Sequence, residues 1–110
     1  MLIRPGDVPE IEEPSNDLVM RKLVEGGDLS ATWVRIAGEH RPLRTDSSTR
    51  LYHVVEGGGW FSLGDERFEI TAGDLVVVPR GTPYALGGEL IYLVLNAPAF
   101  REGDDIYVDI

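Results

Sequence analysis

The sequence predicts an all-β fold, a barrel or sandwich of short antiparallel strands. Residues 50–84 contain four short strand-like runs separated by glycine-bearing turns. Glycine reaches the positive-φ conformations of tight turns at little steric cost, and closely spaced runs bounded by turn residues are typical of barrels. No segment shows the apolar period of a long helix, and the chain has no internal repeat. We therefore expect a single domain built almost entirely from strands.

The first third of the chain predicts an arm followed by two strands. Residues 1–17 are rich in Pro, Glu and Asp and indicate an arm that is at most partly paired into the sheet. Strands are expected at 18–24 and 29–37, joined by the turn Glu25-Gly26-Gly27-Asp28. Residues 38–49 are polar and predict a loop. The barrel domain is then expected to span residues 18–110.

The remaining strands follow from the dense block after this loop. Strands are expected at 51–56 and 60–63, with the triple glycine Gly57-Gly58-Gly59 as the turn between them. Gly64-Asp65 is a hairpin signal leading into a strand at 67–70. Two more apolar runs predict strands, and a short tail closes the chain; these segments are 75–78, 89–95 and 106–110.

Composition excludes several classes of function. The chain has 110 residues, enough for one hydrophobic core, and a formal net charge of -9. This charge repels a nucleic-acid backbone or an anionic membrane, so we expect neither partner. With no cysteine, disulfides and thiolate metal sites are excluded. The N-terminus has no signal-peptide pattern, which favours a cytoplasmic protein.

The spacing of glycine and proline carries a family resemblance. Gly73, five residues, Pro79, one residue, Gly81 and two residues to Tyr84 resemble the second motif of the cupin superfamily, G-x5-P-x-G-x2-H-x3-N. Arg50, six residues and Gly57 resemble the end of its first motif, G-x5-H-x-H-x3–4-E-x6-G. The resemblance spans roughly residues 30–95 and implies a single cupin barrel, a jelly-roll-like double-stranded β-helix, with an N-terminal arm.

The metal ligands that the resemblance implies are replaced in this chain. Metal-dependent cupins hold a divalent ion through two histidines and a glutamate of the first motif and a histidine of the second. Here Arg50 takes the glutamate position, Tyr84 the last histidine position, and Leu43 and Thr45 fall on or near the other two. A fixed cation repels the ion that it would have to bind. We therefore expect no metal and no other cofactor.

Only two histidines are available to restore a metal site. A longer loop before Arg50 would bring His40 toward a ligand position, which makes it a weak metal candidate. His53 is an odd number of residues from Arg50, so it faces outward if Arg50 faces inward. Structural or surface roles are the expectation for both histidines.

The same alternation selects the candidate ligand-binding residues. If Arg50 faces the barrel, Tyr52 and Val54 do as well, and Tyr84 joins them from the second motif. Trp33 or Arg35 of the neighbouring strand completes the candidate set. Two interpretations of Arg50 remain open: it grips an anionic ligand group, or it pairs internally with a carboxylate. The internal partners considered are Glu39, Asp46 and Glu69.

Two classes of function follow from this site. The first is a homodimeric small-molecule-binding protein that holds an anionic or polar metabolite without a metal. The second is a metal-independent enzyme similar to the sugar isomerases and epimerases among cupins, with Tyr84 or Tyr52 as the acid. No histidine is clearly placed as its base. A metal-dependent enzyme with displaced ligands is the third alternative.

Overall fold

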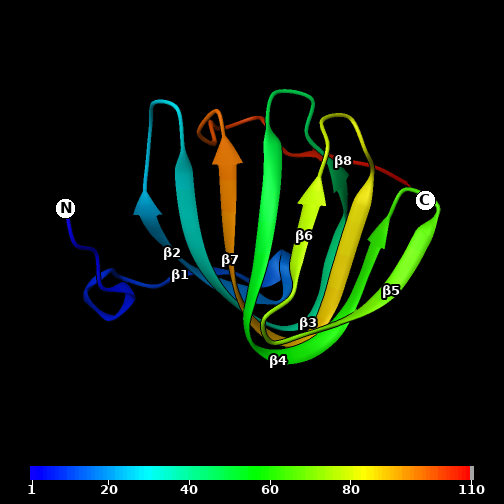
Figure 1. The fold of residues 1–110 in the computed structure, drawn as a ribbon, viewed down its shortest axis with the longest axis horizontal. Helices are drawn as coiled ribbons and strands as arrows, with labels where there is room; N and C mark the ends of the chain where they lie inside the picture. Colours follow the sequence, from blue (N-terminus) through cyan, green and yellow to red (C-terminus); the bar gives the residue numbers. More distant parts are fainter. Residues whose placement is uncertain (110) are drawn as a thin grey trace.

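The computed structural model describes residues 1–109, which form one strongly curved antiparallel sheet (Figure 1). The elements in chain order are η1 Pro5–Asp7, β1 Ile11–Glu13, η2 Pro14–Asn16, β2 Leu18–Val24, β3 Ser30–Arg44, β4 Thr49–Leu63, β5 Glu66–Thr71, β6 Leu75–Val78, β7 Tyr84–Ala97 and β8 Ile106–Tyr107. The chain is therefore nearly all β, as expected. No helix among these residues is long and apolar enough to cross a membrane.

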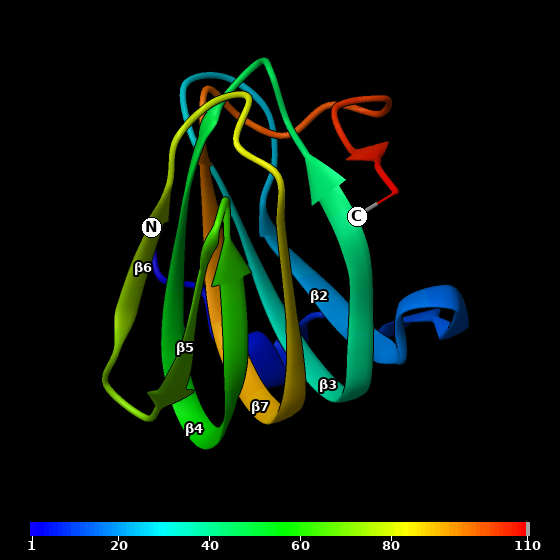
Figure 2. The ribbon, with the colours of Figure 1, turned by 90° about the vertical axis from the view of Figure 1, so that its right-hand side faces the viewer.

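The strands follow the order β1-β2-β3-β7-β4-β5, with β6 on the first half of β4 and β8 on the end of β3. β3, β4 and β7 are long and bend in the middle, so the sheet folds over into the bowl seen in Figures 1 and 2. Among the described residues, β1 at one edge does not pair with β5 or β6 at the other, and the barrel is open on that side.

Glycines mark the line along which the sheet bends. Gly88 of β7 pairs with Gly38 of β3 on one side and with Gly59 of β4 on the other. A Cβ on Gly59 would collide with the backbone of Gly87, and a Cβ on Gly88 would collide with Gly58 and Gly59. The strands approach so closely at this line that only glycine fits. The bend of the whole sheet thus depends on one row of glycines.

This arrangement corrects the expected role of the triple glycine. Gly57-Gly58-Gly59 is not a turn between two strands; it lies inside the continuous strand β4. All three glycines pair with β7, and Gly58 and Gly59 also pair with β5. A bulge between Val54 and Glu56 precedes it, and Gly57 has a φ of 88°. The triple glycine predicts a turn because tight turns and bulged bends of a strand both need the positive-φ conformations that glycine adopts easily.

The expected loop at 38–49 is also largely wrong. β3 continues to Arg44, because its backbone pairs with β7 up to Leu43 and with β8 beyond the bend. Only residues 45–48 connect β3 to β4. The strand at 18–24 has the expected bounds. Within the N-terminal arm, β1 pairs with β2, so the arm is partly joined to the sheet.

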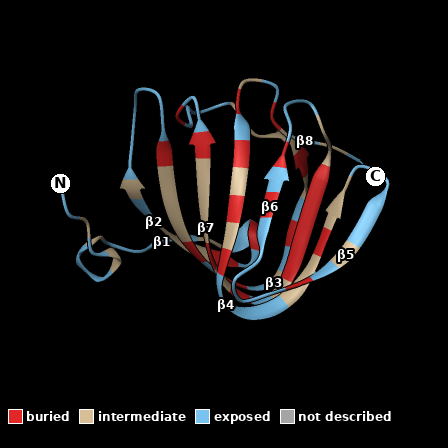
Figure 3. Cartoon of the chain, in the orientation of Figure 1, coloured by how far each residue is buried: buried red, intermediate tan, exposed pale blue. Residues whose placement is uncertain are grey.

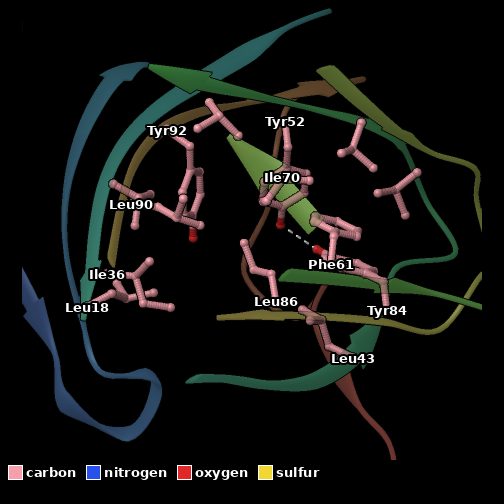
Figure 4. Close-up of a cluster of buried hydrophobic side chains, with 14 residues drawn as sticks. Leu18, Ile36, Leu43, Tyr52, Phe61, Ile70, Tyr84, Leu86, Leu90 and Tyr92 are labelled. Atoms are coloured by element: carbon pink, nitrogen blue, oxygen red, sulfur yellow. Dashed lines mark hydrogen bonds between the residues drawn. The ribbon is translucent and has the colours of Figure 1, made fainter. Parts of the chain in front are cut away.

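The core fills the concave side of the sheet. Buried positions alternate along parts of β3 and β4 and along the second half of β7, whereas the first four residues of β7 are all buried, as the red stretches of Figure 3 show. At its centre the ring of Phe61 stacks on Phe68 and Tyr84, and Tyr52 packs edge-on against Phe61 (Figure 4). Phe61 and Tyr84 are completely buried. Full burial of such an aromatic side chain contributes roughly 1.5–3 kcal/mol, so this cluster fixes the wall on which the candidate site stands.

Candidate functional site in the barrel

A cavity of about 510 Å³ opens on the concave side, beside the aromatic cluster. We call it the barrel cavity. Its walls come from β2, β3, β4 and β7 and from the C-terminal segment, residues 98–109. Its size lies within the usual range of small-molecule pockets. The polar side chains at its wall that matter for chemistry are His40, Arg50, Tyr52, Tyr92, Asn96 and Asp105.

Three of the expected site residues meet at this wall. Nη1 of Arg50 donates a hydrogen bond to the hydroxyl of Tyr84 at 2.7 Å, and the hydroxyls of Tyr84 and Tyr52 are 2.7 Å apart. Figure 4 shows these two tyrosine hydroxyls turned toward one another in the core. Tyr52 and Arg50 line the cavity, whereas Tyr84 stands behind them and does not. The alternation argument is confirmed, because Tyr52 and Val54 are buried and His53 is not.

Arg50 has an internal partner, but not one of the three carboxylates considered from the sequence. Its Nη2 donates to Oδ1 of Asp105 at 2.5 Å, and the guanidinium lies over the ring of Phe100. Both partners come from the C-terminal segment. That segment crosses from the end of β7 toward the end of β3, where β8 pairs (Figure 1). Sequence reasoning missed Asp105 because it is 55 residues from Arg50, in a tail with no regular pattern.

The three expected carboxylate partners lie elsewhere. Asp46 accepts a hydrogen bond from Arg44 at 3.1 Å in the connection after β3. Glu69 on β5 is exposed. Glu39 on β3 lies beside the glycine row, opposite Gly87 in the backbone register of β3 and β7. None of these three carboxylates lines the barrel cavity.

The environment of Arg50 keeps it charged and keeps the tyrosines protonated. Burial alone would lower the pKa of Arg50, but the surrounding oxygens of Tyr52, Tyr84 and Asp105 raise it above its usual value. Burial raises the pKa of Tyr84 and raises that of Tyr52 strongly. The guanidinium and the hydrogen bond shared with Tyr52 act in the opposite direction on the pKa of Tyr84. At neutral pH both phenols therefore carry a proton. The charge of Arg50 favours the anion of either tyrosine, and its hydrogen bond goes to Tyr84.

His40 lies on the same cavity and was placed in a loop by sequence reasoning. It is 8% exposed, and its Nδ1 is 2.8 Å from the carbonyl oxygen of Arg41. A carbonyl only accepts hydrogen bonds, so Nδ1 carries the proton and Nε2 keeps its lone pair. Burial lowers the pKa of His40. Near neutral pH the side chain is thus an uncharged imidazole, and His40 is one of the residues that line the cavity.

A signal for this placement exists in the sequence. Val34 and Ile36 are buried on the concave side of β3, and the two-residue period continues through Gly38 to His40. The polar composition of residues 38–49 concealed that continuation. Tyr92 and Asn96 were missed although both follow the same period in β7 and are buried at the cavity. The candidate set from the sequence contained Arg50, Tyr52, Tyr84, Trp33 and Arg35, and it did not follow the two-residue period to these positions.

Trp33 and Arg35 are not part of the cavity, which corrects the expected set. They project from the convex face of β3, opposite to the buried Val34 and Ile36. The guanidiniums of Arg35 and Arg21 lie over the indole of Trp33. This face differs from that of the cavity because the side chains of a strand alternate.

The cupin metal positions do not suit a divalent cation. Where the resemblance places a glutamate and a histidine, Arg50 and Tyr84 are hydrogen-bonded to one another. Leu43 and Thr45, at or near the other two positions, are buried and offer no imidazole. Among residues 1–109 no group of three or more His, Cys, Asp or Glu side chains is arranged to hold a metal. Arg50 itself is a fixed charge of the wrong sign.

Solved structures similar to this one include a nucleoside dehydratase with several of its variants, KdgF and a polyketide cyclase. The Streptomyces nucleoside dehydratase Pac13 superposes with a TM-score of 0.86 at 22% identity, covering 100% of this chain and 92% of that one. Variants of Pac13 with one histidine or one tyrosine replaced were solved with uridine. KdgF from a Halomonas species has a TM-score of 0.82 at 19% identity, covering 91% of this chain and 96% of that one. The polyketide cyclase RemF from Streptomyces resistomycificus has a TM-score of 0.81 at 21% identity, covering 100% and 86%. At these identities the likeness shows the fold.

Sequence comparison gives the family. An uncharacterised protein of Methanocaldococcus jannaschii is 35% identical over 40 residues, which are 36% of this chain and only 32% of that protein's length. A far longer match covers residues 19–100, from β2 to the start of the C-terminal segment, and its family is described as Cupin. This match spans most of the chain and includes the strands that build the cavity. The protein therefore belongs to the cupin family.

Proposed function

We propose that this cupin binds a polar, hydroxyl-bearing small molecule in the barrel cavity and acts on it by metal-independent acid–base chemistry. The observation that carries the proposal is the presence of a neutral imidazole, His40, and a hydrogen-bonded phenol, Tyr52, at the wall of one cavity. Binding is the more general part of the proposal. Catalysis is the part that these two groups favour over a passive binding protein.

His40 suits the role of the base. Its Nδ1–H is held by the Arg41 carbonyl, so the ring has a fixed orientation and presents Nε2 unprotonated. A base that stays neutral at physiological pH is ready to remove a proton from a bound molecule. The sequence motifs place no histidine clearly as the base, because His40 lies outside them; in the structure His40 lines the cavity.

Tyr52 suits the role of the acid, with Tyr84 and Arg50 behind it. A proton leaving Tyr52 toward the ligand can be replaced from Tyr84, since the two hydroxyls are in hydrogen-bond contact. The resulting charge on Tyr84 faces the guanidinium of Arg50 at 2.7 Å. A buried cation at this distance stabilises a phenolate that would otherwise be expensive to form. Tyr84 is thus a positioning residue and Tyr52 the group that contacts substrate.

These roles fit an elimination or isomerisation. In an elimination, Nε2 of His40 takes a proton from carbon, the electron pair forms a double bond, and the neighbouring C–O bond breaks. Tyr52 protonates the leaving oxygen, which departs as water or an alcohol, and no oxidant or reductant is needed. Pac13 is a nucleoside dehydratase, and its histidine and tyrosine variants were solved with uridine. That likeness in fold supports nucleosides as the first substrates to try.

The test uses binding and turnover together. Uridine, other nucleosides and neutral sugars are screened by thermal shift, because a ligand that binds the native state raises Tm. Compounds that bind are incubated with enzyme and the products identified by mass spectrometry. His40→Gln and Tyr52→Phe are expected to lower turnover by about 10²–10⁴-fold. The control His53→Gln replaces the histidine on the convex face and should leave turnover unchanged.

Three outcomes contradict parts of the proposal. If ligands bind but none is converted, catalysis is refuted and the binding protein remains. If chelator-free protein contains a stoichiometric divalent metal whose removal abolishes turnover, the metal-dependent alternative is correct. Tyr52→Phe retaining full activity would remove the acid role assigned here.

We also propose that the protein is a homodimer that pairs through the convex face of β4, β6 and β7. Most neighbouring outward positions on these strands are apolar, and they surround His53, which pairs with Leu75 and Leu93: Leu51, Leu75, Val77, Leu93 and Leu95. Leu75 is 61% and Val77 54% exposed. A second copy is the favoured occupant because the outward positions named carry no charge while the chain as a whole carries -9, which disfavours contact elsewhere.

A further inference from the structure

We infer that Asp105 determines whether the barrel cavity prefers a neutral or an anionic ligand. Because its carboxylate neutralises Arg50, the cavity binds a neutral molecule more tightly than the anionic counterpart of that molecule. The inference rests on the proposed function, since it concerns the ligand of the same cavity. It also resolves the open choice between the two roles of Arg50. The guanidinium is engaged by the protein itself and is not free to grip an anion.

The first support is the geometry of the guanidinium. Arg50 is 4% exposed, with Nη1 on Tyr84 and Nη2 on Asp105. Nε is buried and has no hydrogen-bond partner among the described residues. Nε and Nη2 form the edge of the guanidinium that binds carboxylate or phosphate with two parallel bonds. Asp105 occupies half of that edge, which is the place an anionic ligand would need.

The second support is the charge around the cavity. Its lining contains four carboxylates, from Glu13, Glu25, Glu102 and Asp105, against the two cations of Lys22 and Arg50. His40 adds no charge while it is neutral. In a cavity with low-dielectric walls, an excess of negative groups repels an anion more strongly than it would in open solvent. A neutral hydroxylated ligand meets no such penalty.

The third support is the position of Asp105 on the molecule. Its side chain is 29% exposed, on the C-terminal segment that also supplies Phe100 and Glu102 to the wall. The segment is held by contacts that do not involve Asp105. Phe100 N–H donates to Ser30, Val108 N–H donates to the Pro42 carbonyl, and Tyr107 accepts from Asn16. The carboxylate can therefore be changed while the segment keeps its anchors.

The experiment measures anion binding with inorganic phosphate as the probe. Wild type, Asp105→Asn and Asp105→Glu are melted in phosphate and in chloride of equal ionic strength. Asp105→Asn removes the negative charge that neutralises Arg50 and leaves only a neutral amide oxygen beside it, so phosphate at about ten times its Kd should raise its Tm by about 5 °C over chloride. Wild type and Asp105→Glu should show no such difference. The double variant Arg50→Gln/Asp105→Asn should lose the phosphate response.

Results that overturn the inference are equally clear. A phosphate response in wild type as large as in Asp105→Asn would show that Asp105 does not exclude anions. The absence of a response in folded Asp105→Asn would show that Arg50 is not the anion site. If Asp105→Asn does not fold in chloride, Asp105→Ser is used, and its failure to be rescued by phosphate counts against the inference.

A second arm separates this inference from the proposed function. Calorimetry compares uridine with uridine 5′-monophosphate on wild type and Asp105→Asn. Wild type should bind the neutral nucleoside about tenfold more tightly, and the variant should reverse the order. If wild type binds neither compound, nucleosides are refuted as ligands while the phosphate arm still decides the role of Asp105. If wild type binds both equally and the variant changes nothing, the charge selection fails and the binding proposal stands.

Discussion

At the scale of single residues, the site is an ordered chain of hydrogen bonds. Asp105 accepts from Arg50, Arg50 donates to Tyr84, and Tyr84 meets Tyr52 at the cavity. A guanidinium only donates hydrogen bonds, so this series of hydrogen bonds runs from Arg50 toward the tyrosine oxygens. The alternation of side chains predicted Arg50 and Tyr52 on one face. Asp105 could not be predicted, because no local pattern links a tail residue to a strand 55 positions earlier.

Titration of His40 makes the stability of the folded protein depend on pH. Its pKa in the folded protein is lowered by burial, below the value of about 6.5 of a free histidine. Hydrogen bonding to Arg41 and the carboxylates of Asp105 and Glu13 oppose this shift, and Arg50 reinforces it. Between the lowered pKa and about 6.5 the unfolded chain binds more protons than the native one. Stability is therefore full above about 6.5 and is lost as the pH falls below it.

Melting curves check this expectation. Tm of the wild type should fall between pH 7 and pH 5, and His40→Gln should fall less over the same range. His53→Gln should follow the wild type. An identical slope in wild type and His40→Gln would contradict the assignment. If His40 is the base, the acid limb of turnover should also lie below pH 6.5, because the native imidazole protonates only there.

At the scale of elements, the glycine row determines the shape of the sheet. The strands at 18–24 and 75–78 were predicted with their full bounds, because apolar runs between turn residues identify strands well. The triple glycine predicts a turn, whereas the structure has a bend within β4 at these residues. A corner in which three strands approach closely is a tertiary property, and the sequence of one strand does not contain its neighbours. Gly38 and Gly88, which complete the row, were not connected with the triple glycine.

A substitution in this row should unfold the sheet at its bend. Gly59→Ala places a methyl group against the backbone of Gly87, and neither strand can move without breaking its pairing. We expect a loss of about 3 kcal/mol in the free energy of unfolding. Urea denaturation measures it, with Gly6→Ala as control, since nothing lies within 4 Å of that position. A loss in Gly59→Ala as small as in the control would refute the close-packed corner.

At the scale of the whole molecule, the concave and convex sides of the sheet have separate roles. The concave side carries the core and the cavity, and the convex side carries the apolar positions of β4, β6 and β7. β6 is an edge strand whose outward side chains are apolar, a combination that proteins usually cover. The resemblance to cupins predicted the fold and the replaced metal ligands. It could not predict which face carries the exposed apolar positions, because that depends on how the strands lie side by side.

The proposed dimer is tested on this face. Leu75→Glu places like charges opposite one another across a twofold interface and should convert the dimer to a monomer. Analytical ultracentrifugation should give twice the 12.1 kDa chain mass for wild type and the single mass for the variant. Leu2→Glu, which is 73% exposed on the N-terminal arm, should stay dimeric. A wild type that sediments as a monomer at all concentrations would end the proposal.

The C-terminal segment has a practical consequence for work on this protein. A recombinant version shortened after Pro98 would retain all six of the longer strands, β2 to β7, and would resemble an intact barrel by circular dichroism. It would nevertheless lack Phe100, Glu102 and Asp105, which form one side of the barrel cavity. Ligand screens are best run with that end of the chain kept whole and any purification tag fused to the opposite end.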